Sequence, residues 1–305
     1  MPRTFVIGTR GSRLALRQTA IVADALRAAH PDVLIEVREV RTEGDRSAAP
    51  LSEIGGLGVF TKAIEDALLR RDVDLAVHSL KDLPPEIAEG LTIGAVPERG
   101  DPRDALVTRD GATLDGLPPG ARIGTGSERR AVQLRALRRD CAPAEIRGNV
   151  DTRVRKVDDG EYDAAVLALA GLERLRLIHR AAQIFSVEEM LPAVGQAALG
   201  VEVRADDAEA LALVAMIDHA ETRAAVEAER AFLRRLGAGC RLPVGAYAEV
   251  AAGTLRLRPQ LRLRAMIAAE SGAITRREVS GAADEAAALG SGLAESMQAA
   301  APGHS

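Results

Sequence analysis

FVIGTRGSRLALRQ (residues 5–18) combines a short strand, a Gly-Thr turn and an amphipathic helix, and the pattern returns at RIGTGSERR (122–130). In each stretch a serine, Ser12 or Ser127, stands where the helix begins, which is typical of a residue that caps the first turn. Elsewhere, β-branched runs such as DLAVHSL (74–80) alternate with helical periodicity. This alternation predicts an α/β fold with parallel sheets, and the repeated pattern indicates two related lobes.

Two stretches rich in turn-forming residues are expected to carry the chain between the lobes, PERGDPRD (97–104) and LPAVGQAALG (191–200). A lobe interrupted by a second lobe needs two such crossings, which would form a hinge. Beyond about residue 215, Ala- and Glu-rich helices and Arg/Leu-rich strands predict a smaller α+β domain. The expected boundaries are residues 1–97 with 198–214 for domain 1, 98–197 for domain 2 and 215–305 for the C-terminal domain.

The composition disfavours several classes of function. Among 305 residues only 2% are aromatic, none is Trp, and the net charge is −4, so nucleic-acid binding is not expected. The two cysteines make no disulfide framework or metal-ligand pair. No apolar run approaches the ~18 residues of a membrane span, and the first residues contain no signal-peptide core. These features favour a cytoplasmic protein with a small-molecule substrate.

Arginine carries most of the positive charge, because only three of the 40 basic residues are Lys. Arg129 and Arg130 occupy the first turn of a predicted helix, where the backbone disfavours cations and favours anions. They are therefore either ligands of a bound anion or solvated side chains in an Arg-rich chain. RGNVDTR (147–153) places Arg147 and Arg153 at another turn. Since Arg suits bidentate binding of carboxylates, the pattern favours a polyanionic small substrate at the strand ends.

HSLKDLP (78–84) places polar side chains at the carboxyl end of the strand predicted at 74–80. Asp82 is either a general acid or base, which could also stabilise a cationic intermediate, or a turn cap before Pro84. We expect His78 to be a packed structural residue rather than a base.

LGAGCRLPVG (236–245) places Cys240 in a glycine-flanked loop beside Arg241. A neighbouring cation favours the thiolate, so Cys240 is a candidate nucleophile or covalent attachment point. The alternative is a small buried apolar residue, as we expect for Cys141.

The glycine-containing loop at 44–58 matches neither a P-loop nor GxGxxG, which disfavours a nucleotide-dependent enzyme. We predict that this loop is a lid over a cleft. A non-catalytic solute- or effector-binding protein with the same two lobes stays an alternative, although it would need neither Cys240 nor a third domain.

Taken together, these segments resemble the hydroxymethylbilane synthase family, also called porphobilinogen deaminase. The resemblance covers nearly the whole chain, with its motifs in family order. The matching stretches are TRGSRLALRQ (9–18), TEGD (42–45), FTKAIEDALL (60–69), LAVHSLKDLP (75–84), RGDPRDAL (99–106), GTGSERR (124–130), IRGNVDTR (146–153), GEYDAAVLALAGLERL (160–175), LPAVGQ (191–196) and AERAFLRRLGAGCRLPVGAYAE (228–249).

The resemblance implies two lobes like those of periplasmic binding proteins and a third domain that carries a cofactor cysteine. The implied cofactor is a dipyrromethane, thioether-linked to the position of Cys240. It would prime the head-to-tail condensation of four porphobilinogens, with loss of ammonia, into hydroxymethylbilane for haem biosynthesis. A monomer is implied as well.

The resemblance also assigns the site. The catalytic aspartate falls on Asp82. Cofactor-binding positions fall on Ser79, Lys81, Thr125, Ser127, Arg129, Arg130, Arg147 and Gly148, and substrate-binding positions on Arg10, Gln18, Arg153 and Arg174. The sequence departs from the family pattern at Glu53 and Leu57 in the lid, where lysines are common, at Gly126, and at Ala197, where Gly is usual.

Overall fold

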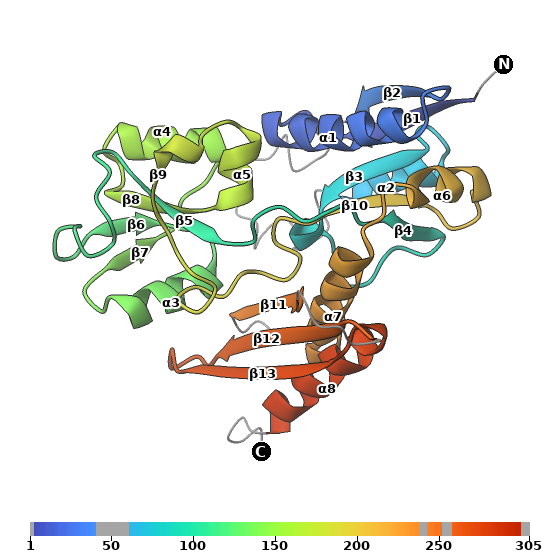
Figure 1. The fold of residues 1–305 in the computed structure, drawn as a ribbon. Coiled ribbons are helices and arrows are strands. Elements are labelled where there is room, and N and C mark those ends of the chain that lie inside the picture. Colours follow the sequence, from blue (N-terminus) through green and yellow to red (C-terminus); the bar gives the residue numbers. More distant parts are fainter. Residues whose placement is uncertain (1–2, 41–60, 238–242, 252–257, 300–305) are drawn as a thin grey trace. The chain divides into compact units, whose positions relative to one another are not determined.

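The computed structural model describes residues 3–40, 61–237, 243–251 and 258–299, and the chain forms two compact units (Figure 1). Unit 1 comprises Met1–Arg99 and Ala198–Arg223, and unit 2 comprises Gly100–Ala197 and Ala224–Ser305. The divisions at 99/100 and 197/198 lie inside the two segments that were predicted to be crossings. The three predicted domain boundaries stay a prediction.

Unit 1 contains a five-stranded sheet in the order β2-β1-β3-β10-β4. Strand β1 is parallel to β2 and β3, whereas β10 is antiparallel to both β3 and β4. The strands are β1 (Thr4–Thr9), β2 (Leu34–Glu39), β3 (Leu75–Ser79), β4 (Leu91–Ala95) and β10 (Leu199–Arg204), and the helices are α1 (Arg13–Ala29), α2 (Lys62–Leu69) and α6 (Ala208–Ala215), with the 3₁₀ turn η2 (Leu80–Asp82) after β3.

Unit 2 contains a second five-stranded sheet, in the order β7-β6-β8-β5-β9. Strand β6 is parallel to β7 and β8, and β5 is antiparallel to β8 and β9. The strands are β5 (Asp104–Thr108), β6 (Arg122–Gly124), β7 (Ala142–Ala144), β8 (Ala164–Ala168) and β9 (Ala181–Ile184), and the helices are α3 (Glu128–Leu137), α4 (Val150–Asp158) and α5 (Leu169–Arg174), followed by the 3₁₀ turn η3 (Ile178–Arg180).

The two five-stranded sheets have the same topology. In each, three parallel strands are followed by one antiparallel strand and an edge strand. The prediction of two related α/β lobes is therefore confirmed, and the sheets, which were expected to be parallel, are mixed, since each contains an antiparallel strand. The antiparallel strands β5 and β10 each begin directly after a crossing, so they enter their sheets from the other lobe and in the opposite direction.

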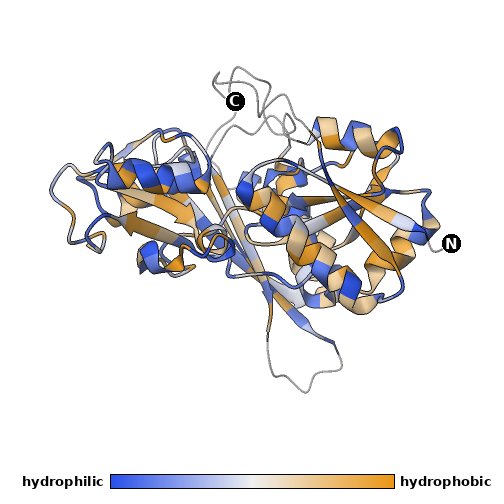
Figure 2. Ribbon diagram, turned by 90° about the horizontal axis from the view of Figure 1, so that it is seen from above, coloured by the Kyte–Doolittle hydropathy of each residue, from blue (hydrophilic) through white to orange (hydrophobic). Residues whose placement is uncertain are grey.

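The C-terminal part of unit 2 is the predicted small α+β domain. Its antiparallel sheet has the order β11-β12-β13, and its helices cover an apolar core that includes Phe232, Leu261 and Leu263. The helices that can be seen in Figure 2 carry both hydrophilic and hydrophobic residues, as helices with one buried face require. The elements are α7 (Ala220–Leu236), β11 (Val244–Val250), β12 (Gln260–Ala268), β13 (Ile274–Ala282), η4 (Ala283–Glu285) and α8 (Ala286–Ala299). No helix among the described residues is long and apolar enough to cross a membrane.

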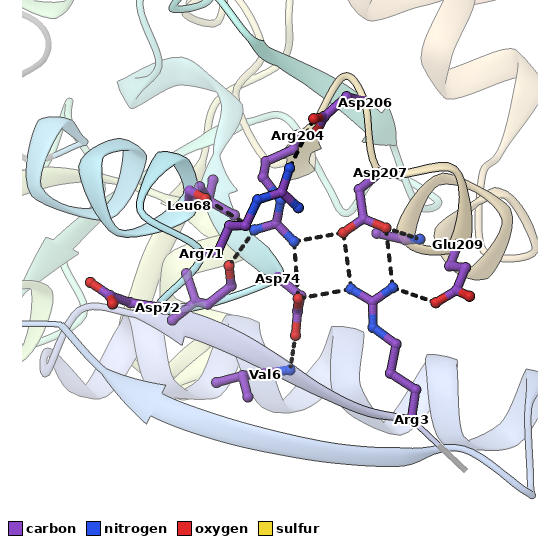
Figure 3. A network of polar contacts seen from close by, with 12 residues as sticks. Arg3, Val6, Leu68, Arg71, Asp72, Asp74, Arg204, Asp206, Asp207 and Glu209 are labelled. Atoms are coloured by element: carbon purple, nitrogen blue, oxygen red, sulfur yellow. Dashed lines mark hydrogen bonds and ion pairs between the residues drawn. The ribbon is translucent and has the colours of Figure 1, made fainter. Parts of the chain in front are cut away.

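A network of charged side chains lies at the end of the unit 1 sheet where strands β1 and β3 begin (Figure 3). Arg204 is buried at the end of β10 and donates to Asp74 and Asp207 at 3.0 and 2.6 Å. Arg3 donates to the same two carboxylates and to Glu209. Burial alone would raise the pKa of Asp207, but the hydrogen bonds from these arginines hold it well below its usual range. This network lies where β1 and β3 begin, at the edge opposite the predicted site residues.

The second crossing contains a strained residue, because Ala197 has a φ of 70°. This left-handed conformation costs an L-residue about 1–2 kcal/mol, and the greater chain entropy of glycine offsets roughly 0.5–1 kcal/mol. We therefore expect Ala197→Gly to raise the free energy of unfolding by about 0.5–1 kcal/mol in urea titrations. Ala198→Gly is the matched control, because Ala198 is fully buried without a positive φ and should lose stability. Equal losses in both variants would contradict the strain.

Candidate active site

The unit 1 site residues lie at the carboxyl ends of the parallel strands β1 and β3. Arg10 directly follows β1, Ser79 ends β3, and Lys81 and Asp82 lie in η2. The edge beyond the carboxyl ends of parallel strands is where ligands bind in open α/β sheets. The local strand-to-turn pattern thus brings these polar side chains to one edge, as expected from the sequence.

Asp82 is exposed, and its carboxylate makes no hydrogen bond or ion pair with the described residues. The turn closes through the backbone instead, where Leu83 N donates to Leu80 O at 3.3 Å. This geometry does not support the interpretation of Asp82 as a turn cap. It leaves the carboxylate available to a ligand.

The neighbours of Asp82 are held from within the unit. Gln18 on α1 is 4% exposed and donates Nε2 to Ser79 Oγ at 2.8 Å. Gln18 therefore orients Ser79, while its predicted contact with substrate stays a prediction. His78 is 6% exposed, and its Nε2 lies 2.9 Å from Glu202 Oε2, which confirms the expectation of a packed residue.

In unit 2, Thr125 and Ser127 follow β6 and lead into α3. The Thr125 hydroxyl accepts a hydrogen bond from Ser127 N at 3.1 Å. Ser127 is the N-cap residue of α3, as predicted, but its side chain makes no capping hydrogen bond. By contrast, Ser12 caps α1 as predicted, since its Oγ accepts from Ala15 N at 3.2 Å.

The turn before α4 needs glycine at one position. Gly148 has a φ of 106°, and a Cβ there would lie 2.7 Å from Thr152 Cγ2. Its carbonyl accepts from Arg153 Nε at 2.8 Å. Arg147, whose side chain is 41% exposed, pairs with Glu145 at 2.6 Å. The guanidinium groups of the RGNVDTR segment thus lie beside a tightly turned backbone at the carboxyl end of β7.

Arg174, at the end of α5, is a desolvated cation. Burial lowers its pKa to about 10, against a smaller opposing effect of Glu173. Arg174 donates to Ala197 O at 2.6 Å, and no described carboxylate forms an ion pair with it. A half-buried guanidinium that forms no ion pair with a described carboxylate is suited to binding the carboxylate of a ligand.

Arg129 and Arg130 are buried around an acid of the chain itself. Arg129 Nη2 lies 2.8 Å from Asp104 Oδ2, and Arg130 Nη2 lies 2.7 Å from Asp104 Oδ1. Both arginines also donate to backbone carbonyls. Burial would raise the pKa of Asp104, but the two guanidinium charges hold it well below its usual range. The alternative of solvated side chains is therefore wrong, and the carboxylate that both guanidinium groups bind in this structure is Asp104 of the chain itself.

Asp104 and Gln196 were not among the predicted site residues. Gln196 Nε2 donates to Asp104 Oδ1 at 2.8 Å and to Pro102 O at 2.7 Å, which ties the second crossing to the first. An acid at the first position of an otherwise apolar strand, DALVT, was the available signal. A buried acid at that position requires a buried cationic partner, and Arg129 and Arg130 are its partners.

Two predicted features lie outside the described residues, namely Cys240 and the lid at 44–58 with Glu53 and Leu57. Cys141 is described. It is 8% exposed in the apolar core of the second sheet, and burial raises the pKa of its thiol. Its predicted structural role is confirmed.

Comparison with known proteins decides the family. Residues 5–212 match the family model for the dipyromethane cofactor binding domain of porphobilinogen deaminase, and residues 223–299 match the model for its C-terminal domain. The chain belongs to the porphobilinogen deaminase family. It is 48% identical to porphobilinogen deaminase from a Roseiflexus species over 97% of this chain and 96% of that protein. The protein of the same name from Desulforudis audaxviator is 51% identical, over 96% and 94% of the two chains.

Membership of the porphobilinogen deaminase family makes the chain a transferase of tetrapyrrole and haem biosynthesis with a dipyrromethane cofactor. This confirms the resemblance seen in the sequence, and the alternative of a non-catalytic binding protein is therefore wrong. Among solved structures, an arginine-specific periplasmic binding protein from Salmonella typhimurium superposes with a TM-score of 0.41 and 14% identity, over 70% of this chain and 90% of that chain. The benzoate-bound effector domain of BenM gives a TM-score of 0.41 at 15% identity, over 69% and 88% of the two chains.

Proposed function

We propose that this porphobilinogen deaminase family member joins four porphobilinogens head-to-tail into hydroxymethylbilane and releases one ammonia for each. The structural observation that carries the proposal is the exposed Asp82 carboxylate, which forms no hydrogen bond or ion pair with a described side chain. Each condensation breaks the aminomethyl C–N bond of one pyrrole and bonds that methylene carbon to the free α-carbon of another. The α-carbon loses its proton, and ammonia leaves. After the fourth condensation, one water releases the tetrapyrrole and supplies the hydroxyl of its terminal hydroxymethyl group.

Asp82 is proposed to act at the charged stage of this reaction. Loss of ammonia leaves a cationic pyrrole, which a carboxylate stabilises by accepting a hydrogen bond from the pyrrole N–H. The same carboxylate can take up or return the proton that the chemistry moves. Its position at a strand end is where an α/β fold presents such a group to a substrate.

The dipyrromethane cofactor fits the donor set of the described residues. Each pyrrole ring carries an acetate and a propionate, so the cofactor and the growing chain are strongly anionic. Arg174, desolvated and without an ion-pair partner among the described residues, is suited to the carboxylates of the pyrroles that are added to the growing chain. When bound, the cofactor supplies the terminal pyrrole carbon to which the first porphobilinogen is joined.

The remaining site assignments are proposals of the same kind. Arg10, Gln18, Arg153 and Arg174 are assigned to substrate, and Ser79, Lys81, Thr125, Ser127, Arg129, Arg130, Arg147 and Gly148 to the cofactor. Arg129 and Arg130 would use for this role the guanidinium N–H groups that do not donate to Asp104 or to backbone carbonyls. A cytoplasmic location and a monomeric state also stay predictions.

Attachment through Cys240 is tested by intact mass. Protein made in a host that synthesises porphobilinogen should carry an adduct of two pyrrole units, and Cys240→Ser should lose both the adduct and turnover. A thiolate is the only cysteine form that acts as a nucleophile here, and serine cannot replace it.

Cys141→Ser is the matched control, because Cys141 is the other cysteine of the chain and is buried in the core. It should keep the adduct and form hydroxymethylbilane from porphobilinogen. Unmodified wild-type protein with full activity would overturn the attachment. Wild-type protein that carries the adduct but releases no ammonia from porphobilinogen would overturn the proposed reaction.

A further inference from the structure

The turn that carries Asp82 is held by the neighbouring strand. Since the Asp82 carboxylate bonds to no described residue, its position follows the backbone of β3 and η2. Leu80 N donates to Ala198 O at 3.0 Å, just before β10. The Leu80 side chain lies against Gly200, where a Cβ would be only 2.6 Å from Leu80 Cδ2. Strand β10 therefore sets the course of the turn.

A buried hydrogen bond makes a second link between β3 and β10. His78 Nε2 and Glu202 Oε2 are 2.9 Å apart, with His78 6% exposed and Glu202 fully buried. In the sheet register, His78 pairs with Gly200 and Glu202 pairs with Ala76. Because His78 and Ala76 point to the same face of β3, the imidazole reaches Glu202 diagonally across the two strands. His78 lies one residue before Ser79 and four residues before Asp82 in the chain.

The surroundings of Glu202 are unfavourable for a carboxylate. Its Oε1 is buried and has no hydrogen-bond partner among the described residues. A second acid, Glu65 on α2, lies nearby: burial raises the pKa of Glu65, a hydrogen bond with Thr61 opposes this, and the charge of Glu202 adds to the rise. Replacing both partners of a buried hydrogen bond by apolar side chains of the same shape is often neutral or stabilising. The stability of the sheet alone therefore does not explain His78 and Glu202.

We propose that His78 and Glu202 are positioning residues that fix the direction in which β3 presents Asp82 to the substrate. The inference rests on the proposed function, because it takes Asp82 as the group that acts on the pyrrole. A hydrogen bond has a preferred direction and length, so the His78–Glu202 contact adds a directional constraint to the backbone pairing of β3 and β10 that an apolar pair would not supply. A displacement of about 1 Å at a reacting group can cost roughly 10²-fold in rate.

The decisive variant is the double substitution His78→Leu/Glu202→Leu in cofactor-loaded protein. The apolar pair should leave Tm unchanged or higher. We expect kcat to fall about 10- to 100-fold and KM to stay close to the wild-type value, because the arginines assigned to the substrate carboxylates are unchanged. His78→Gln, which keeps an N–H donor for Glu202, should retain most of the wild-type kcat.

His30→Leu is the control for losing a histidine hydrogen bond in the same unit. His30 Nε2 lies 3.0 Å from Leu213 O, at the far end of α1 from the site edge. This variant should lower Tm and leave kcat unchanged. A folded double variant with normal kcat would overturn the inference, as would a loss in His78→Gln as large as in the double variant.

A second variant covers the case in which the double variant does not fold. Glu202→Gln keeps the volume and an acceptor oxygen for His78 but, without the carboxylate charge, accepts a weaker hydrogen bond than the one that His78→Gln retains, and should lower kcat about fivefold at unchanged KM. Unchanged kcat would overturn the positioning role. Wild-type enzyme that forms no hydroxymethylbilane would instead overturn the proposed function, and this inference with it.

Discussion

Replacing Asp82 by asparagine is expected to lower kcat by about 10²–10⁴-fold, the range of general acid–base catalysis. Asn keeps the size and part of the hydrogen-bonding capacity of Asp but has neither its charge nor its proton affinity. Because the exposed carboxylate makes no bond with the described residues, its replacement should leave Tm unchanged. Turnover and melting are measured on the same preparation, supplied with preformed tetrapyrrole so that the cofactor is in place.

Glu86→Gln is the matched control for Asp82→Asn. Glu86 is an exposed acid four residues further along the chain and has no assigned role. The control should retain wild-type turnover. Near-normal turnover in Asp82→Asn would refute the catalytic assignment, and a fall in Tm would show that Asp82 holds its turn after all.

Replacing Asp104 by asparagine should lower the free energy of unfolding by about 3–5 kcal/mol, the usual cost of removing one partner from a buried ion pair. The side chains of Arg129 and Arg130 are 5% and 7% exposed, and that of Asp104 is fully buried. The variant leaves two guanidinium groups buried without a counter-charge. Urea unfolding at neutral pH measures the loss.

Asp158→Asn is the control, because Asp158 forms an exposed pair with Arg180 at 2.5 Å. Such pairs contribute about 0–1 kcal/mol. Equal, small losses in the two variants would contradict the stabilising role of the buried group.

The stabilisation by Asp104 should also depend on pH. Its folded-state pKa lies well below the unfolded value of about 3.9, so the stabilisation is complete above that value and is lost as the pH falls towards the folded pKa. Between about pH 5 and pH 3, the wild-type protein should therefore lose more stability than Asp104→Asn. Parallel pH profiles of the two proteins would count against the charge as the cause.

Much of the local structure follows from the sequence. The helix expected near 13–29 is α1 (Arg13–Ala29), and the strand expected at 74–80 is β3 (Leu75–Ser79). Both elements were predicted from the spacing of apolar residues within one segment, and such spacing depends only on residues that are close in the sequence. The same alternation placed Asp82 beyond a strand end. The family resemblance, which depends on the order of many motifs, was likewise available from the sequence.

Only the tertiary structure decided which groups meet. Arg129 and Asp104 are 25 residues apart, and Gln196 and Asp104 are 92 apart, so no local pattern joins them. Ser12 and Ser127 stand in the same motif, yet only Ser12 caps its helix. The direction of β5 and β10 depends on the lobe from which each strand arrives. Pairing of buried charges and direction of strands are set by contacts between distant segments, and sequence spacing does not encode those contacts.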